Sequence, residues 1–313
     1  MKIILIGPGF MPIPPPAWGA VESIVWDYYE NLKKKGIDVI IVNTSNTSQI
    51  IKECNNINPD IIHIMYDDYI VVAPYLNCKK IFYTSHYAYI THPNFKNQYS
   101  GYFNNIFMKV IENQRYVTVN AISQNIIDVY RKYGFNGKIN LVHNGAREDL
   151  FVYKNNPSKI NKSVYIAKIE FRKAQYKYQS IDNIDFVGHY HDSPFNTKNS
   201  NYIGSWDKPT LYNNLSDYAN MILLSDGEAD PLVIKEALIA GLGIVASESA
   251  SANLDRMKDF IDIIPNDMIN DMKYVDDIIK KNRIKSKERR EEIRQYAMET
   301  FAWNKIIDLY LNL

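Results

Sequence analysis

The chain has 313 residues, enough for about two domains that each bury a core of their own. Hydrophobic residues make up 46% of it and charged residues 23%, as in ordinary globular proteins, so wholesale disorder is excluded. A net charge of +1 offers no global field for wrapping nucleic acid, which is therefore not an expected partner. Two cysteines are too few for a disulfide framework or a four-ligand zinc site. With no leader-like or membrane-spanning stretch, the composition predicts a cytoplasmic protein.

The first half of the chain alternates short β-branched runs with amphipathic stretches, a pattern typical of βαβ units around a parallel sheet. Val21–Lys35 places its apolar residues on one helical face, and Gly36 ends that helix. Further helices are predicted near Tyr102–Glu112 and Gln124–Tyr133. The predicted strands are Ile3–Ile6, Asp38–Val42, Ile61–Met65, Lys80–Tyr83, Tyr116–Ala121 and Ile139–Val142.

A second series of strands follows the polar segment Lys154–Ser158, which is the best candidate for a linker. Its predicted strands are Ser163–Ala167, Asp185–Val187, Asn201–Ile203, Met221–Leu224 and Gly243–Ala246. The mixed charges of Lys280–Arg294 are typical of a solvated helix face. We therefore predict two Rossmann-like domains, residues 1–156 and 157–296. Ligands of doubly wound sheets bind beyond the carboxyl ends of the strands, so two such domains facing each other would enclose a cleft.

The strongest chemical signal is the segment SDGEADPLVIKEALIAGLGIVAS, which contains Glu228 and Glu236 just after a predicted buried strand. A loop there opens a helix at Leu232–Ala240, and the free N–H groups of a helix start suit a phosphate or a sugar hydroxyl. Gly19 lies at another predicted helix start, where a missing side chain lets the backbone approach a ligand. Spacing alone assigns neither glutamate as a general base.

Further motifs occur along the chain in a fixed order. They are the proline-rich loop Gly7–Glu22 with Ala20 in place of a second glycine, Thr84-Ser85-His86, Val142–Phe151 around His143-Asn144-Gly145, Tyr165–Lys173, and Phe301-Ala302-Trp303. Together with the glutamate segment, this set resembles the retaining glycosyltransferases of the GT-B fold, specifically the group 1 or GT4-type family. The resemblance spans nearly the whole chain.

The resemblance implies that the C-terminal domain holds a nucleotide-diphosphate sugar and that the N-terminal domain presents a glycan or glycoconjugate acceptor. It also implies that residues 297–313 form a helix that packs back on the first domain. The implied catalytic residues are His86, Lys168, Lys173 and Glu228. The implied donor-binding residues are Gly19, Ala20, Asn144, Ala229, Asp230, Pro231, Leu232, Val233 and Glu236. Transfer would retain the anomeric configuration and use neither a cofactor nor a metal.

Two departures from the family pattern concern the diphosphate site. Lys168 stands where the family usually has Arg, and Ala167 and Ala174 stand where it usually has Gly. A lysine cannot supply the bidentate fork of a guanidinium, so the donor is held differently or more weakly. Taken alone, Lys173 also fits a solvated loop charge and His86 fits a satisfied histidine at a strand end.

Other functions remain open at this level. A sugar-nucleotide epimerase would share the fold, and a glycogen-type phosphorylase would be far longer. A catalytically idle nucleotide-sugar-binding module would also fit the departures. Asp67-Asp68 is the nearest approach to an Asp-x-Asp metal motif. The basic run Lys33–Lys35 leaves peripheral membrane contact possible, although basic residues at a helix end also complement its dipole.

Overall fold

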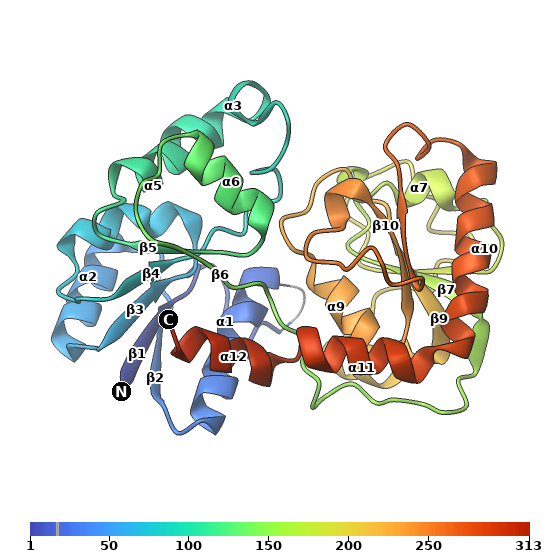
Figure 1. Cartoon of the computed structure of the whole chain (residues 1–313), viewed down its shortest axis with the longest axis horizontal. Helices are drawn as coiled ribbons and strands as arrows, with labels where there is room; N and C mark the ends of the chain where they lie inside the picture. The colour runs from blue at the N-terminus through green and yellow to red at the C-terminus, as the bar shows by residue number, and fades with distance from the viewer. Residues whose placement is uncertain (17–18) are drawn as a thin grey trace. The chain divides into compact units, whose positions relative to one another are not determined.

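The structure is a computed structural model that describes residues 1–16 and 19–313. Its chain divides into two compact units, both built from helices packed around a parallel sheet (Figure 1). One unit comprises Met1–Asn144 with Ile306–Leu313, and the other comprises Gly145–Lys305. The units therefore divide near residue 144, whereas the sequence predicts a domain boundary at 156. Ala17 and Trp18, part of the predicted proline-rich motif, lie outside the described residues.

The first unit contains a six-stranded sheet in the order β2-β1-β3-β4-β5-β6, with every pairing parallel. Ile3–Ile6 in β1 are fully buried, because this strand is covered on both sides by its neighbours in the sheet and by helices on its faces. The strands are β1 (Lys2–Ile6), β2 (Asp38–Val42), β3 (Ile61–Ile64), β4 (Ile81–Tyr83), β5 (Thr118–Ala121) and β6 (Ile139–Leu141).

The three predicted helices of the first unit are present, although aromatic residues interrupt one of them, and the helix at Thr47–Ile57 was not predicted. The predicted helix at Tyr102–Glu112 is divided by a π turn at Phe103–Phe107, whose two terminal rings stack 5.5 Å apart. The helical segments are α1 (Ala20–Lys34), α2 (Thr47–Ile57), a 3-10 segment (Asp67–Tyr75), α3 (Phe95–Gln98), α4 (Ser100–Tyr102), α5 (Met108–Glu112) and α6 (Gln124–Lys132).

The end of the chain contributes to the core of the first unit. Helix α12 runs from Trp303 to Leu311, and Tyr310 near its end stacks on the His63 ring with 5.6 Å between ring centroids. Tyr28 and Phe82 meet the same tyrosine edge-on. Burial, helped by the nearby His86, lowers the pKa of His63 to about 3, so its imidazole is neutral.

The second unit contains a five-stranded sheet in the order β11-β10-β9-β7-β8, again with every pairing parallel. Its strands are β7 (Lys159–Ile166), β8 (Ile184–Val187), β9 (Tyr218–Leu223), β10 (Gly243–Ser247) and β11 (Ile261–Ile264). The prediction of a strand at Asn201–Ile203 is wrong. That segment forms one bridge, between Tyr202 and Phe186, before the chain turns at Gly204 with φ +80. The edge strand β11 was not predicted.

The helices of the second unit include two long ones near the C-terminus. The prediction of a solvated face at Lys280–Arg294 is only partly right, because Arg283 and Arg290 are buried. Arg283 donates to the Ser163 hydroxyl, and Arg290 donates to the Tyr218 carbonyl. The helices are α7 (Gln175–Tyr178), α8 (Lys208–Asn214), α9 (Leu232–Ile239), α10 (Met272–Glu288) and α11 (Arg290–Thr300), with 3-10 turns at Phe171–Lys173, Leu215–Asp217 and Glu248–Ala250. In the described part of the chain, every helix is too short or too polar to cross a membrane.

Candidate functional site

The loop after β7 and the loop after β9 are joined at the carboxyl ends of two neighbouring strands. The Tyr165 hydroxyl donates to the Lys173 carbonyl and accepts a hydrogen bond from the Leu224 N–H at 2.9 Å. Asp226 N–H also donates to the Arg172 carbonyl at 3.0 Å. These three bonds hold the 3-10 turn at Phe171–Lys173 beside the segment that carries Glu228. The fold thus brings Lys173 close to Glu228, two predicted site residues that are far apart in sequence.

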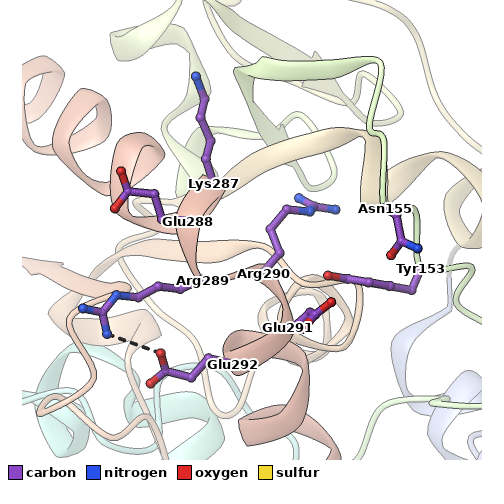
Figure 2. Close-up of a pocket in the computed structure, with 8 residues that line it drawn as sticks. All are labelled: Tyr153, Asn155, Lys287, Glu288, Arg289, Arg290, Glu291 and Glu292. Atoms are coloured by element: carbon purple, nitrogen blue, oxygen red, sulfur yellow. Dashed lines mark hydrogen bonds and ion pairs between the residues drawn. The ribbon is translucent and has the colours of Figure 1, made fainter.

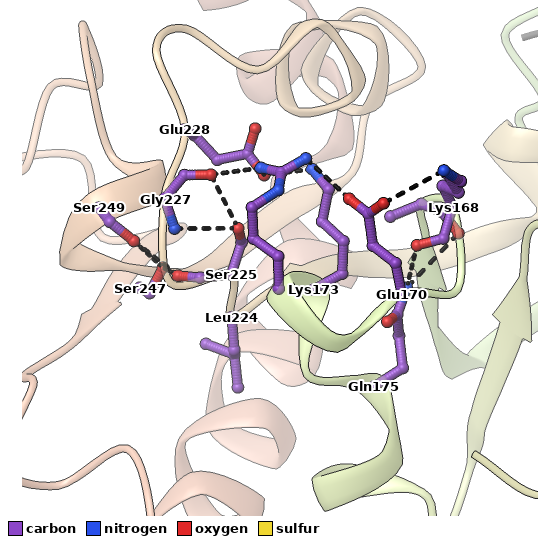
Figure 3. Close-up of polar contacts among 12 residues, drawn as sticks. Lys168, Glu170, Lys173, Gln175, Leu224, Ser225, Gly227, Glu228, Ser247 and Ser249 are labelled. Carbon is purple, nitrogen blue, oxygen red and sulfur yellow. Dashed lines mark hydrogen bonds and ion pairs between the residues drawn. The ribbon is translucent and has the colours of Figure 1, made fainter. Parts of the chain in front are cut away.

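Five charged side chains in these loops form a continuous series of ion pairs, which we call the charged ladder. Its members are Lys168, Glu170, Arg172, Glu228 and Lys173. Glu170 pairs with Lys168 at 3.4 Å and with Arg172 at 2.9 Å. Glu228 pairs with Arg172 at 3.2 Å and with Lys173 in direct contact. Figure 3 draws these contacts. The ladder has three cations and two carboxylates, so it carries a net positive charge.

The inner pair of the ladder, Lys173 and Glu228, is almost fully buried, with side chains 11% and 10% exposed. Burial lowers the pKa of Lys173, and Glu228 opposes that shift. Burial acts to raise the pKa of Glu228, but Lys173, Arg172 and a hydrogen bond from Ser225 outweigh it and leave that pKa below its ordinary value. The carboxylate of Glu228 is therefore ionised at neutral pH.

Hydroxyl groups fix the backbone of the loop that precedes Glu228. Ser247 and Ser249 both donate to the Ser225 carbonyl at 2.6 Å, and the Ser225 hydroxyl contacts Gly227 (Figure 3). Arg172 donates to the Gly227 carbonyl. This loop is therefore held by side chains from two strand ends and cannot shift without breaking several hydrogen bonds.

The predicted donor-binding residues Ala229–Val233 form the turn into α9. Pro231 is the N-cap of this helix and makes no side-chain hydrogen bond, so its side chain satisfies none of the free backbone N–H groups of the first turn. The Asp230 carboxylate lies inside the protein, where it pairs with Lys235 and accepts a hydrogen bond from Asn253 at 3.0 Å. Both partners of the Asp230–Lys235 pair are essentially unexposed. Asp230 can thus meet a ligand through its backbone alone.

Glu236 lies on α9 and has a cationic neighbour that no sequence motif marks. Lys208, at the start of α8, contacts the Glu236 carboxylate at 3.1 Å. The Glu236 side chain is 10% exposed and that of Lys208 is 32% exposed. A carboxylate held in this way can accept hydrogen bonds from the hydroxyl groups of a ligand.

One departure from the family pattern has a conformational consequence. Ala174 has φ 55 and ψ 18, the left-handed conformation that glycine adopts at lower cost. The next residue, Gln175, is buried and donates to the Lys168 carbonyl at 2.9 Å. The turn that carries Lys173 is therefore kept in a strained conformation by contacts on both sides.

His86, Gly19, Ala20 and Asn144 belong to the first unit. Asp67 holds the loop that carries His86, because it accepts hydrogen bonds from the hydroxyls of Ser85 and Tyr102. Asp67 therefore links the His86 loop to Tyr102, and sequence spacing gave no sign of these partners. The described residues contain no group of three or more His, Cys, Asp or Glu side chains placed to hold a metal ion.

The remaining first-unit residues are Gly19 and Ala20 at the start of α1 and Asn144 at the last position before the second unit. Gly19 precedes α1, and its carbonyl accepts the Ser23 N–H at 2.9 Å. A Cβ at Gly19 would lie 2.8 Å from the Glu22 carboxylate and 2.8 Å from the Met11 sulfur, so a side chain there would crowd the loop. Ala20 is exposed and Asn144 is buried. The predicted site residues are therefore divided between the two units.

A cavity of about 350 Å³ lies elsewhere in the second unit, between the segment after residue 152 and the junction of α10 and α11 (Figure 2). Three basic and three acidic side chains line it, and none of the predicted site residues does. Its lining residues are Tyr153, Asn155, Lys287, Glu288, Arg289, Arg290, Glu291 and Glu292. The cavity therefore gives no support to the predicted donor site.

Comparison with known proteins identifies the fold. No family model matches the chain, and no curated protein matches its sequence. Among solved structures, HepE from Anabaena in complex with UDP and glucose matches with a TM-score of 0.70 at 15% identity, covering 100% of this chain and 99% of that one. Sucrose-phosphate synthase from Thermosynechococcus elongatus matches with a TM-score of 0.74 at 14% identity, covering 99% and 98%.

A glycosyltransferase from Rickettsia africae is also similar, with a TM-score of 0.60 at 15% identity and coverage of 99% of this chain and 97% of that chain. Identities this low establish the fold and nothing finer. The chain therefore has the GT-B fold of two Rossmann-like α/β domains, as the sequence predicts.

Proposed function

We propose that this protein is a glycosyltransferase of the retaining GT4 type that moves a sugar from a nucleotide-diphosphate sugar to a glycan or glycoconjugate acceptor. The observation that carries the proposal is the charged ladder, which places three cations and the carboxylate of Glu228 at the carboxyl ends of β7 and β9. Ligands of doubly wound sheets bind at those ends. HepE, a structural neighbour, binds UDP and UDP-glucose, which supports a nucleotide-sugar donor.

Four predicted site residues of the second unit then have chemical roles. The bond between the anomeric carbon and the β-phosphate oxygen breaks, and negative charge grows on the leaving diphosphate. Lys168 and Lys173 supply positive charge there, and a fixed cation stabilises that transition state more than the ground state. Glu228 accepts hydrogen bonds from the transferred sugar, and Glu236 accepts them from the ribose hydroxyls.

The acceptor hydroxyl attacks the anomeric carbon from the face that the diphosphate leaves. Its proton passes to the departing phosphate oxygen, so the reaction balances without a protein base and retains the anomeric configuration. His86 in the first unit orients the sugar, and the backbone N–H groups at Gly19 and at the start of α9 complement the phosphates. The proposal includes no divalent metal, so activity should survive chelator treatment.

The experiment is transfer from radiolabelled UDP-, GDP- and ADP-sugars to a panel of glycan acceptors, with NMR of the first product to fix its anomeric configuration. Glu236→Ala should weaken donor binding by about 1.5–3 kcal/mol, the loss of a hydrogen bond to a charged group. Lys198→Ala, an exposed lysine in the same unit, is the matched control. Epimerised donor without transfer would identify an epimerase, and tight binding without turnover would identify an idle binding module.

A further inference from the structure

Glu170 occupies an unusual place in the charged ladder. Its carboxylate lies between Lys168 at 3.4 Å and Arg172 at 2.9 Å, and it remains 18% exposed (Figure 3). Its own backbone is fixed, because the Glu170 carbonyl accepts the Lys173 N–H at 3.0 Å. The residue thus pairs with both of the more exposed cations of the ladder, whose side chains are 43% and 25% exposed, and offsets part of their charge.

The other carboxylate of the ladder is differently placed. Glu228 is buried against Lys173 and Arg172, and removing it would leave a buried lysine without its partner. Glu170 holds Lys168 and Arg172 through partly exposed pairs, which are individually weak and easily exchanged for another anion. A phosphate offers the same cations more charge and more acceptor oxygens than a carboxylate does.

We propose that Glu170 is an internal counterion of the donor site, which holds Lys168 and Arg172 until the diphosphate of the donor displaces it. The inference rests on the proposed function. It assigns Glu170 a role in setting donor affinity: a ligand without phosphate leaves the two ion pairs in place, whereas a diphosphate displaces the Glu170 carboxylate from both cations. Every diphosphate pays the cost of breaking two partly exposed ion pairs, so Glu170 weakens binding of the donor and its product alike.

The test is calorimetric titration of Glu170→Gln with UDP, GDP and ADP and with the three corresponding nucleosides. Two weak ion pairs correspond to about a 3- to 10-fold change in affinity, so we expect the variant to bind its diphosphate that much more tightly than the unsubstituted protein. Affinity for the nucleoside, which carries no phosphate, should be unchanged. The gain should shrink in 0.5 M salt, about the point where exposed charges are screened within a few ångströms.

Glu291→Gln removes an exposed glutamate from α11 in the same unit and is the matched control, with no change in affinity expected. Unchanged or weaker diphosphate binding by Glu170→Gln would overturn the inference and leave the proposed function intact. The inference would also be overturned if the affinity for the nucleoside rose as much as the affinity for its diphosphate, because the effect would then not act through phosphate. Failure of the unsubstituted protein to bind any of the three diphosphates would instead refute the proposed function.

Discussion

Replacing Lys173 by alanine should destabilise the second unit as well as slow turnover. The sequence suggested a loop lysine with no role in the core, but the structure buries it against Glu228. Breaking a buried ion pair from one side costs about 3–5 kcal/mol, because the remaining charge keeps its desolvation cost without its partner. Arg172 stays 3.2 Å from the Glu228 carboxylate and offsets part of that cost, so we expect a loss near the lower limit, about 3 kcal/mol.

Differential scanning calorimetry measures this loss directly. A change of 1 kcal/mol moves the melting temperature of a domain of 150–250 residues by about 2–4 °C, so the transition of the second unit should fall by about 6–12 °C. Lys198→Ala should not change the melting temperature of the second unit, since that lysine is exposed. Turnover of Lys173→Ala should fall by about 10²–10³, the usual cost of removing one group that stabilises transition-state charge.

A double variant separates the buried charge from the lost packing. Lys173→Met with Glu228→Gln removes both charges and keeps similar volumes, so it should recover most of the lost stability while staying inactive. Two results would refute this reasoning: a melting temperature for Lys173→Ala equal to that of Lys198→Ala, or a double variant that loses the sum of its single losses.

Three further outcomes are expected. Lys168→Arg should keep its pair with Glu170 and change stability by less than about 0.5 kcal/mol, with kcat/KM equal or higher because a guanidinium grips two phosphate oxygens; a dead enzyme would contradict the motif alignment. Because the pKa of His63 is about 3 when folded and 6.5 when unfolded, the unfolded chain binds the extra proton between those values, and stability should fall by up to about 1.4 kcal/mol per pH unit as pH drops below 6.5; melts of His63→Gln should show a shallower slope. Tyr310→Ala should destabilise the first unit by about 3–5 kcal/mol and Tyr310→Phe by less than about 1 kcal/mol in urea unfolding, because only the former removes the ring that stacks on His63.

The sheets were predictable because their strands are short β-branched runs with clear polar boundaries. Ile3–Ile6 and Met221–Leu224 read as buried strands in the sequence and are fully buried in the structure. Asn201–Ile203 is shorter and begins with a polar residue, and it forms a single bridge before Gly204 turns the chain away. The strand at Ile261–Ile264 was missed because it is an edge strand, in which Asp262 interrupts the apolar run.

The candidate site was only partly predictable, because its residues are defined by partners distant in sequence. Lys173 and Glu228 were identified from motifs, yet the burial of Lys173 follows from a partner 55 positions away. Lys208, which pairs with Glu236, stands in a segment that no motif marks. Propensity and periodicity describe neighbours within about one turn, so pairings of this kind require the tertiary structure.

Two exceptions to local rules lie near the two loops of the second unit. Ala174 has a left-handed conformation that glycine would adopt more easily, and Lys235 is fully buried beside Asp230, although lysine is among the residues least often buried. Each of these features costs stability, and the apolar core of the second sheet has to offset that cost. Because sequences that specify one fold violate local rules mainly where function requires it, the loops around Lys173 and Glu228 are where the chemistry of this protein is best sought.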